Sequence, residues 1–377
     1  MGDIKLKKGT GILFVMAVLF ISSLIYLHYG DQNTLRVGIF YGSNWEVPGT
    51  VHYEILDQAI KKFESKYPNV KVEYEKGILS NDYSEWLSEQ ILKGTEPDVY
   101  LVLDEDFNTL ASLGALKNLD MLVGGDKEFD FNVFYSSVYK AGQYEGSQYA
   151  LPMECNPTLM FVNKTLLQKE GIKVPDNDWT WDDFYDICKT IVKDSDGDGQ
   201  MDQFGCYDYT WLQAVYSNGI TPFNQSGTSS NFLDEKFSQS LEFVKRLEAT
   251  NRNYQVTSND FDLGKVAFRP FTFSDYRTYM PYPWRIKKYS GFEWTCIRMP
   301  AGPSGDNRSE MSALMAGMSS RTEKKQCAWD FVKLLTTDTD IQKLVYEDTS
   351  AASVLKSVNT SQDTMNLLNK DTPGDSI

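Results

Sequence analysis

Histidine is almost absent from this sequence of 377 residues, which contains only His28 and His52. A metal site built on several histidines, or a Ser-His-Asp triad in the folded body, is therefore nearly excluded. The motifs GxGxxG, GxxxxGK[ST], HExxH and GxSxG are also missing. Carboxylates are common, but no pattern fixes two of them at the separation that a glycosidase needs. These absences argue against an enzyme.

Positive charge is scarce as well. Lys and Arg total 37 against 52 Asp and Glu, which gives a formal net charge of −15. A surface of this sign repels phosphate backbones. We therefore expect no nucleic-acid partner.

The cysteines are few and scattered, and no CxxC pair occurs. The five are Cys155, Cys188, Cys206, Cys296 and Cys327. An odd number at wide spacing indicates neither a disulfide framework nor a zinc cluster. Buried free thiols are expected, and a single disulfide is the alternative.

The N-terminus is one long apolar run behind a basic start. Lys5, Lys7 and Lys8 precede residues 9–27, which carry no charge and approach the ~20 residues that span a bilayer. The run is longer than a usual signal core, and no A-x-A-like site follows it. This predicts a retained anchor over 1–34, with a cleaved secretory signal as the alternative. Everything after Asp31 should lie outside the cytoplasm, anchored to the cell membrane, or secreted if the signal is cleaved.

The body of the chain follows an α/β pattern. Hydrophobic residues make up 41% of the sequence, so a packed core is expected. Strand and helix signals alternate at 35–41, 53–67, 70–75, 86–94 and 98–103. This predicts a parallel sheet covered by helices, with ligands beyond the carboxyl ends of the strands. Short strands at 149–153 and 158–163 and helices at 181–193, 231–250 and 323–336 suggest a second region of the same kind.

Two strand-end loops carry candidate ligand contacts, at 42–50 and 104–107. They contain Trp45 and the acids Asp104, Glu105 and Asp106. Carboxylates that accept from hydroxyls and an indole that stacks on C–H groups are what a sugar site uses. From position alone, solvated acids and a half-buried tryptophan are the simpler interpretation. Aromatic runs at 207–211, 271–276 and 279–284 are further candidates for a pocket lining.

The segment 194–202 resembles the first part of a calcium loop. Asp194, Asp196 and Asp198 occupy positions 1, 3 and 5, Gly199 position 6 and Asp202 position 9. Position 12 is Gly205, so the bidentate glutamate is missing. We expect a structural calcium ion of modest affinity, and the alternative is an acidic turn that binds nothing tightly. The predicted ligands are Asp194, Asp196, Asp198, the backbone of Gln200, and Asp202. No cofactor is expected to be required for function.

Several segments, in this order and spacing, resemble one protein family. They are AIKKFESKYPNVKVEYE (59–75), GTEPDVYLVLDEDFNTLASLGALKNL (94–119), YALPMECNPTLMFVNKTLLQKEGIKVPDNDWTWDDF (149–184), GKVAF (264–268), MPAGPSGD (299–306) and AWDFVKLLTT (328–337). The sequence is similar to the extracellular solute-binding proteins of ABC importers, family 1, which are maltose-binding-protein-like. Gram-positive members usually carry a lipobox cysteine. This chain has no cysteine before Cys155, which puts its tethering in doubt.

The resemblance implies an α/β, two-lobed, periplasmic-binding-protein-like fold of type II with a hinge, preceded by one N-terminal transmembrane or signal helix. Lobe 1 would be 35–153 with 299–318 returning to it, and lobe 2 would be 154–297 with 320–377 returning. The implied function is to bind a carbohydrate, with a neutral oligosaccharide favoured, between the lobes of a monomer. Hinge closure would enclose the ligand, which ABC permease subunits would then take up. The alternative is a membrane-tethered sugar sensor that feeds a two-component kinase.

The family's binding positions can be carried over residue by residue. Where the family often has a glycine-tryptophan pair, this chain reads Arg269-Pro270-Phe271, so the stacking ring of that segment is a guess among three aromatics. The residues that the resemblance assigns to the ligand are Tyr41, Trp45, Asp104, Glu105, Asp106, Glu154, Asn156, Tyr209, Trp211, Phe271, Phe273 and Tyr276.

Overall fold

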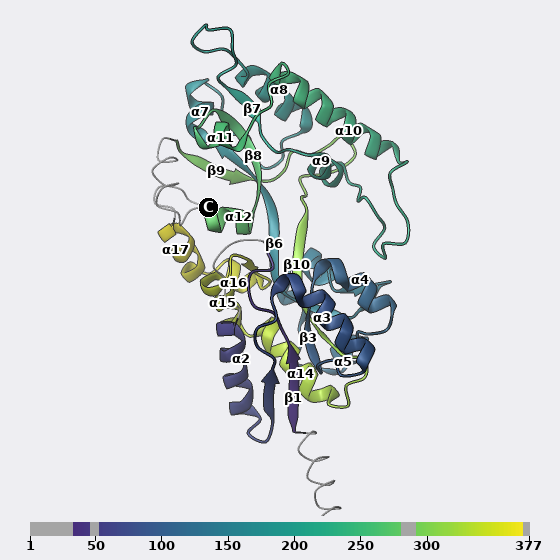
Figure 1. Cartoon of the computed structure of the whole chain (residues 1–377). Helices are drawn as coiled ribbons and strands as arrows, with labels where there is room; N and C mark the ends of the chain where they lie inside the picture. The colour runs from purple at the N-terminus through teal and green to yellow at the C-terminus, as the bar shows by residue number, and fades with distance from the viewer. Residues whose placement is uncertain (1–32, 46–52, 280–291, 372–377) are drawn as a thin grey trace, which may run out of the picture.

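The centre of the molecule is one long strand, β6 (Ala150–Asn163), which runs from one lobe into the other (Figure 1). The computed structural model describes residues 33–45, 53–279 and 292–371. Three longer strands pair antiparallel with β6, beside the short β11 (Ala352–Ser353): β10 (Met311–Met318) along its first half, and β8 (Val266–Thr272) and β9 (Trp294–Ile297) along its second. The two short strands predicted at 149–153 and 158–163 are therefore one strand that joins the lobes.

Lobe 1 contains the predicted β-α-β-α-β unit. Its strands β2 (Lys71–Tyr74), β1 (Thr34–Gly38) and β3 (Val99–Val102) run parallel, and β10 pairs antiparallel with β3. Gly94 caps the second helix with φ 71°, at the end of the helix signal predicted for 86–94. The other elements before β6 are α2 (Tyr53–Lys66), α3 (Ser80–Lys93), α4 (Asp104–Ser112), α5 (Asp120–Gly125), η1 (Phe131–Val133), α6 (Ser136–Lys140), β4 (Gln143–Tyr144) and β5 (Ser147–Gln148).

Lobe 2 continues the same sheet in the order β6, β8, β7 (Phe204–Cys206), so that β7 forms its edge. Thr180 and Asp183 form a capping box at the start of a helix, as predicted. The core lies between this helix and the sheet and includes Phe184 and Phe268. The helices of lobe 2 are α7 (Lys164–Lys169), α8 (Trp181–Ile191), α9 (Trp211–Ser217), α10 (Glu235–Glu248), η2 (Ala249–Asn251), α11 (Ser258–Asp262) and α12 (Phe273–Tyr279).

The lobe boundaries differ from those predicted. Ala301 exchanges backbone hydrogen bonds with Trp179 and Trp181, so 299–305 still lies on lobe 2. The chain returns along β10, and α14 (Lys325–Thr337) and α15 (Thr339–Asp348) then pack on lobe 1. The predicted return of 320–377 to lobe 2 is wrong for these two helices, because their apolar faces complete the core of lobe 1.

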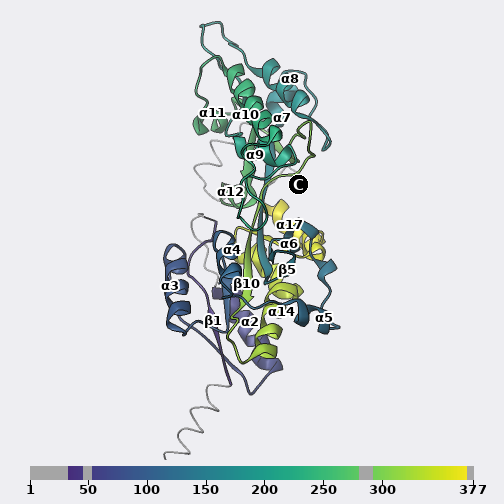
Figure 2. The ribbon, with the colours of Figure 1, turned by 90° about the vertical axis from the view of Figure 1, so that its right-hand side faces the viewer.

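The remaining elements lie beside the crossing between the lobes. They are β11 (Ala352–Ser353), which pairs with β6, α16 (Lys356–Asn359) and α17 (Gln362–Asp371). A third hydrophobic cluster gathers here and includes Phe134 of lobe 1, Phe271 of lobe 2 and Leu355. Figure 2 shows the narrow waist at which these segments meet.

The predicted anchor falls almost wholly outside the described residues, since 1–32 are not among them. In the described part of the chain, no helix is both long and apolar enough to cross a membrane. All five cysteines lie in that part and are free, as predicted. Burial raises the pKa of Cys155 to about 12, so this thiol stays protonated.

A partly buried ion pair fixes α14 to the rest of lobe 1. Lys333 Nζ lies 2.6 Å from Asp126 Oδ2, and Trp329 Nε1 donates to the same oxygen at 2.9 Å. Burial by itself would raise the pKa of Asp126, but hydrogen bonds from Lys333 and Trp329 outweigh it and lower the pKa from 3.8 to about 2. Because the pKa of Asp126 is lower in the folded protein, its ion pair stabilises the fold at every pH above the usual carboxyl pKa of 3.8. This stabilisation is lost as the pH falls from 3.8 towards 2.

We therefore predict that Lys333→Met lowers the free energy of unfolding by about 1–2 kcal/mol at pH 7. The deficit relative to wild type should shrink as the pH falls below 4. Urea unfolding at several pH values measures it. Lys343→Met is the control, because Lys343 pairs with the exposed Asp363 and should cost little. Equal midpoints for Lys333→Met and wild type at pH 7 would contradict the prediction.

Candidate functional site

The lobes meet at a group of polar side chains that we call the interlobe junction: Trp45, Asp104, Glu105, Tyr216 and Glu310. Trp45 follows β1, and the two neighbouring acids begin α4. Glu310 directly precedes β10, and its carbonyl accepts from the Thr158 N–H of β6. Tyr216 comes from α9 of lobe 2. Residues from both lobes thus surround the point at which the chain crosses.

Asp104 and Glu105 lie in the first turn of α4, and not in a loop as predicted. Acidic side chains are favourable there because they face the positive end of the helix dipole. Asp104 also accepts a hydrogen bond from the backbone N–H of Ala313 on β10. The side chain of Asp104 keeps contact with solvent, but surrounding protein atoms displace part of its water shell. This desolvation, together with the negative charges of Glu105 and Glu310, raises the pKa of Asp104 to about 6.

Tyr216 is the contribution of lobe 2 to this group. Burial raises the pKa of its hydroxyl, and the negative charges of Glu310 and Asp104 add to the effect. Burial likewise raises the pKa of Glu310. A phenol that donates and carboxylates that accept form a set suited to a ligand rich in hydroxyl groups. Neither Tyr216 nor Glu310 was predicted, because neither lies in a strand-end loop or an aromatic run.

Glu154 holds Trp45 in place. Its side chain is fully buried in β6, and its Oε2 accepts from Nε1 of Trp45 at 3.0 Å. The predicted ligand role of Glu154 is therefore wrong for this conformation. The buried carboxylate orients the indole of Trp45, which is half-buried against the core of lobe 1.

Asn156 is also a structural residue and not an exposed ligand contact. It is buried, its Oδ1 accepts from the backbone N–H of Ser274 at 2.9 Å, and its Nδ2 donates to Ser274 Oγ at 2.8 Å. Ser274 lies in the first turn of α12. The amide thus ties the crossing strand to lobe 2.

Four predicted stacking rings lie in hydrophobic cores. Tyr209, Phe271, Phe273 and Tyr276 are all at most 8% exposed. The Tyr209 hydroxyl lies 3.4 Å from Ser217 Oγ. These rings are not available to stack on a ligand in this conformation, so their predicted role is wrong. A dense aromatic run does not reveal which of its members point inward.

The other predicted contacts stay at the surface. Tyr41 is 42% exposed and follows β1, and Asp106 accepts from Ser84 Oγ at 2.5 Å. Trp211 is 41% exposed, but it lies five residues before Tyr216 on α9. At 3.6 residues per turn, the two side chains diverge by about 140°. Trp211, which the resemblance assigned to the ligand, therefore points away from the junction.

A second contact between the lobes lies away from the crossing. Nε2 of Gln225 in lobe 2 donates to the carbonyl of Gln143 in lobe 1 at 3.2 Å. The loop that carries Gln225 is ordered by Asn224, whose Oδ1 accepts from the backbone N–H groups of Thr228 and Ser229. This preformed loop spans the gap between the lobes beside α4.

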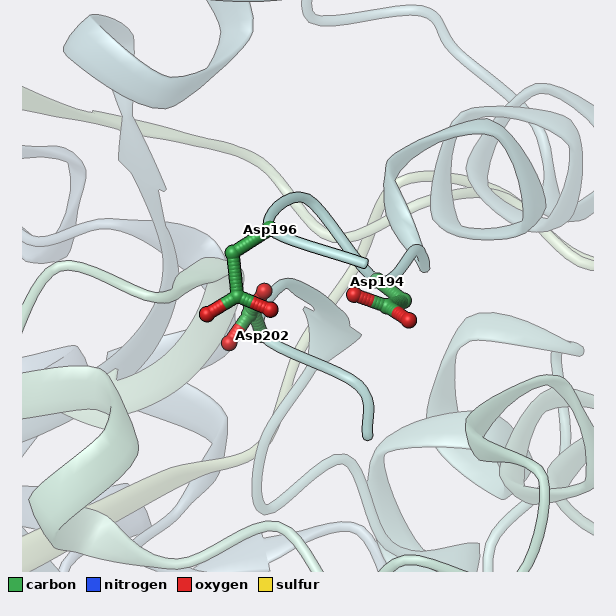
Figure 3. Close-up of side chains that lie close together, drawn as sticks. All are labelled: Asp194, Asp196 and Asp202. Atoms are coloured by element: carbon green, nitrogen blue, oxygen red, sulfur yellow. The ribbon is translucent and has the colours of Figure 1, made fainter. Parts of the chain in front are cut away.

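The predicted calcium loop brings three of its five candidate ligands together. Carboxylate oxygens of Asp194, Asp196 and Asp202 lie within 4.8 Å of one another (Figure 3). Asp198 lies outside this group and accepts from the Gln200 N–H at 2.7 Å. Backbone N–H groups, first that of Gly199, hold the pKa of Asp194 below its usual range. Three converging carboxylates suit a hard cation.

A family model described as bacterial extracellular solute-binding protein matches residues 48–341. The chain belongs to this family. A solute-binding protein releases its ligand unchanged, so the chain is not an enzyme, as predicted. The family is also an extracellular one, which agrees with the predicted location outside the cytoplasm.

One curated relative of this solute-binding protein is the multiple sugar-binding protein of Streptococcus mutans serotype c. The two are 28% identical over 138 residues, which are 36% of this chain and 30% of the relative. The aligned stretch thus spans less than a third of that relative's length.

Solved structures resemble it over most of its length. M. tuberculosis UspC matches with a TM-score of 0.71 at 15% sequence identity. The match covers 90% of this chain and 85% of the UspC chain. MalE of Xanthomonas citri has a TM-score of 0.70 at 17% identity, with coverages of 90% and 84%. Lmo0181 of Listeria monocytogenes, solved with cycloalternan, has a TM-score of 0.59 at 21% identity, with coverages of 89% and 84%. These likenesses confirm the predicted two-lobed fold of type II.

The calcium loop generates a prediction about stability. We expect calcium to raise the melting temperature and a chelator to lower it, because a cation relieves the repulsion among the three carboxylates. Asp196→Asn should abolish the difference between the two conditions. Asp178→Asn, at an exposed position outside the group, should preserve it. Identical wild-type melting curves with calcium and with chelator would show that the loop is only an acidic turn.

Proposed function

We propose that this protein binds a neutral oligosaccharide at the interlobe junction and delivers it to an ABC permease. The observation that carries the proposal is that the charges of Asp104 and Glu310 act on the hydroxyl of Tyr216, so that groups from both lobes lie within electrostatic range of one another. Similar proteins support a sugar ligand: the Listeria protein was solved with cycloalternan, and the Xanthomonas protein is named a sugar-binding protein. Carboxylates at the junction disfavour phosphorylated or uronic ligands by charge repulsion.

The proposed mechanism is a shift between open and closed arrangements of the lobes. A ligand that contacts both lobes binds the closed form better and so raises its population. The shift can be no larger than the difference in affinity between the two forms. No covalent chemistry is needed, because the work of the protein is to capture and hand over the ligand.

We further propose that the protein acts as a monomer on the outer side of the cell membrane. Its tether would be residues 9–27, behind Lys5, Lys7 and Lys8. A retained anchor would keep the binding protein near the permease. The alternative role, a sugar sensor that feeds a kinase, has no support from the similar proteins.

The ligand can be sought with a thermal-shift screen over a panel of neutral glycans, since a ligand that binds only the folded form raises the melting temperature. With the best glycan, Tyr216→Phe should weaken binding roughly ten- to hundredfold, because it removes a hydrogen bond of about 1–3 kcal/mol. Glu310→Gln should weaken binding as well, because it replaces a charged acceptor with a weaker neutral one. Calorimetric titration measures this loss. Tyr135→Phe, at a partly exposed position of lobe 1, is the control and should bind like wild type. If Glu310→Gln and Tyr216→Phe both keep the wild-type affinity, the ligand does not bind at the interlobe junction.

Asp104 should make the affinity depend on pH. Its pKa of about 6 means that the carboxylate is ionised at pH 7.5 and largely protonated at pH 5. An ionised carboxylate accepts hydroxyl hydrogen bonds more strongly, so affinity should fall as the pH falls through 6. A glycan bound to the carboxylate would shift this midpoint downwards. Asp104→Asn should remove the dependence between pH 5 and 7.5, and an equal pH profile for variant and wild type would contradict this.

A further inference from the structure

A groove of about 800 Å³ lies wholly within lobe 2, along the β7 edge of the sheet. Three segments line it: the connection from β7 to α9, the second half of α10, and the chain that follows α10. None of its lining residues belongs to lobe 1. A ligand could therefore occupy this groove whether the lobes are open or closed.

The groove is separate from the interlobe junction. Trp211 lines the groove, whereas Tyr216 of the same helix is placed beside Asp104 and Glu310. The two side chains leave α9 about 140° apart, so they serve different faces of the helix. None of the five junction residues lines the groove.

Two exposed aromatic rings mark the walls of the groove. Trp211 is 41% exposed and packs on Phe237, with ring centroids 5.7 Å apart. Tyr254 is 42% exposed and stacks on Phe204 at 4.5 Å and 17°. Each ring is thus fixed by a buried ring behind it and leaves much of its own surface accessible. Fixed, accessible rings are suited to stacking on the C–H faces of sugars.

Polar groups lie between the rings. Asp208, Lys245 and Glu248 line the groove and carry charges of both signs. Among the described residues, Oδ1 of Asn251 is buried without a hydrogen-bond partner. A buried acceptor without a donor is costly, so this wall of the groove carries an unsatisfied polar group just beneath its surface. The mixed charges favour a neutral ligand over an anion or a cation.

The backbone of the groove is strained at two non-glycine residues. Asp208 has φ 64° and Asn253 has φ 67°, both in the left-handed region. Such positions cost free energy and tend to persist where function requires them. Both residues belong to the lining of the groove.

We propose that this groove is an accessory carbohydrate site, which holds a stretch of a neutral glycan outside the interlobe junction. Trp211 and Tyr254 stack on sugar rings, and the side chains of Asp208, Lys245 and Glu248 exchange hydrogen bonds with the hydroxyl groups of the glycan. The groove binds segments of long chains at the surface and so concentrates glycan near the junction. This site does not depend on the junction binding the same sugar.

The test is affinity electrophoresis of the full chain in native gels that contain soluble starch, galactomannan, xyloglucan or mixed-linkage β-glucan. We expect at least one of these polysaccharides to retard the wild-type protein. Trp211→Ala and Tyr254→Ala should each abolish most of the retardation, whereas Trp211→Phe and Tyr254→Phe, which keep a ring, should restore it. Tyr135→Ala, which removes a partly exposed ring of lobe 1, should migrate like wild type.

The junction variant Glu310→Gln separates the two sites. This variant should lose oligosaccharide affinity in calorimetry and yet be retarded by the polysaccharide like wild type. A negative result for the junction therefore leaves the test of the groove valid, and the reverse also holds. The proposal is overturned if none of the four polysaccharides retards the wild type. It is equally overturned if Glu310→Gln abolishes the retardation while Trp211→Ala and Tyr254→Ala retain it.

Discussion

The structure depends on one strand that both lobes share. The first half of β6 pairs with β10 in lobe 1, and its second half pairs with β8 and β9 in lobe 2. Each lobe has its own core, whereas the crossing consists of β6, β10 and the short β11. These strands run between the lobes, so a hinge movement would bend them and also rearrange the third hydrophobic cluster and the contact of Gln225 with Gln143.

Two buried polar residues in the crossing connect β6 to opposite lobes. Glu154 accepts from Trp45 of lobe 1, and Asn156 bonds with Ser274 of lobe 2. They are two positions apart and so lie on the same face of the strand. Glu154 thereby fixes the orientation of Trp45 at the crossing. The residues that the ligand would contact and the residues that form the hinge are, in this way, immediate neighbours.

The sequence predicted local features well and side-chain directions poorly. Gly94 and the pair Thr180 and Asp183 signal helix ends by their own chemistry, and the structure confirms them. Two short strands were predicted at 149–153 and 158–163, and they form the single strand β6, which accommodates Pro152 and Pro157 with a register shift in β10. Phe273 was placed at the ligand and lies in the core, since burial of one ring among several is decided by tertiary packing.

The central claim is that a ligand at the interlobe junction favours the closed arrangement of the lobes. Small-angle X-ray scattering tests this directly, because closure of two end-to-end lobes shortens the molecule. The radius of gyration of the wild-type protein should fall when the best glycan of the screen reaches saturation, and it should not change for Glu310→Gln at the same glycan concentration. A radius that stays constant while calorimetry shows the wild type to be saturated would contradict the account.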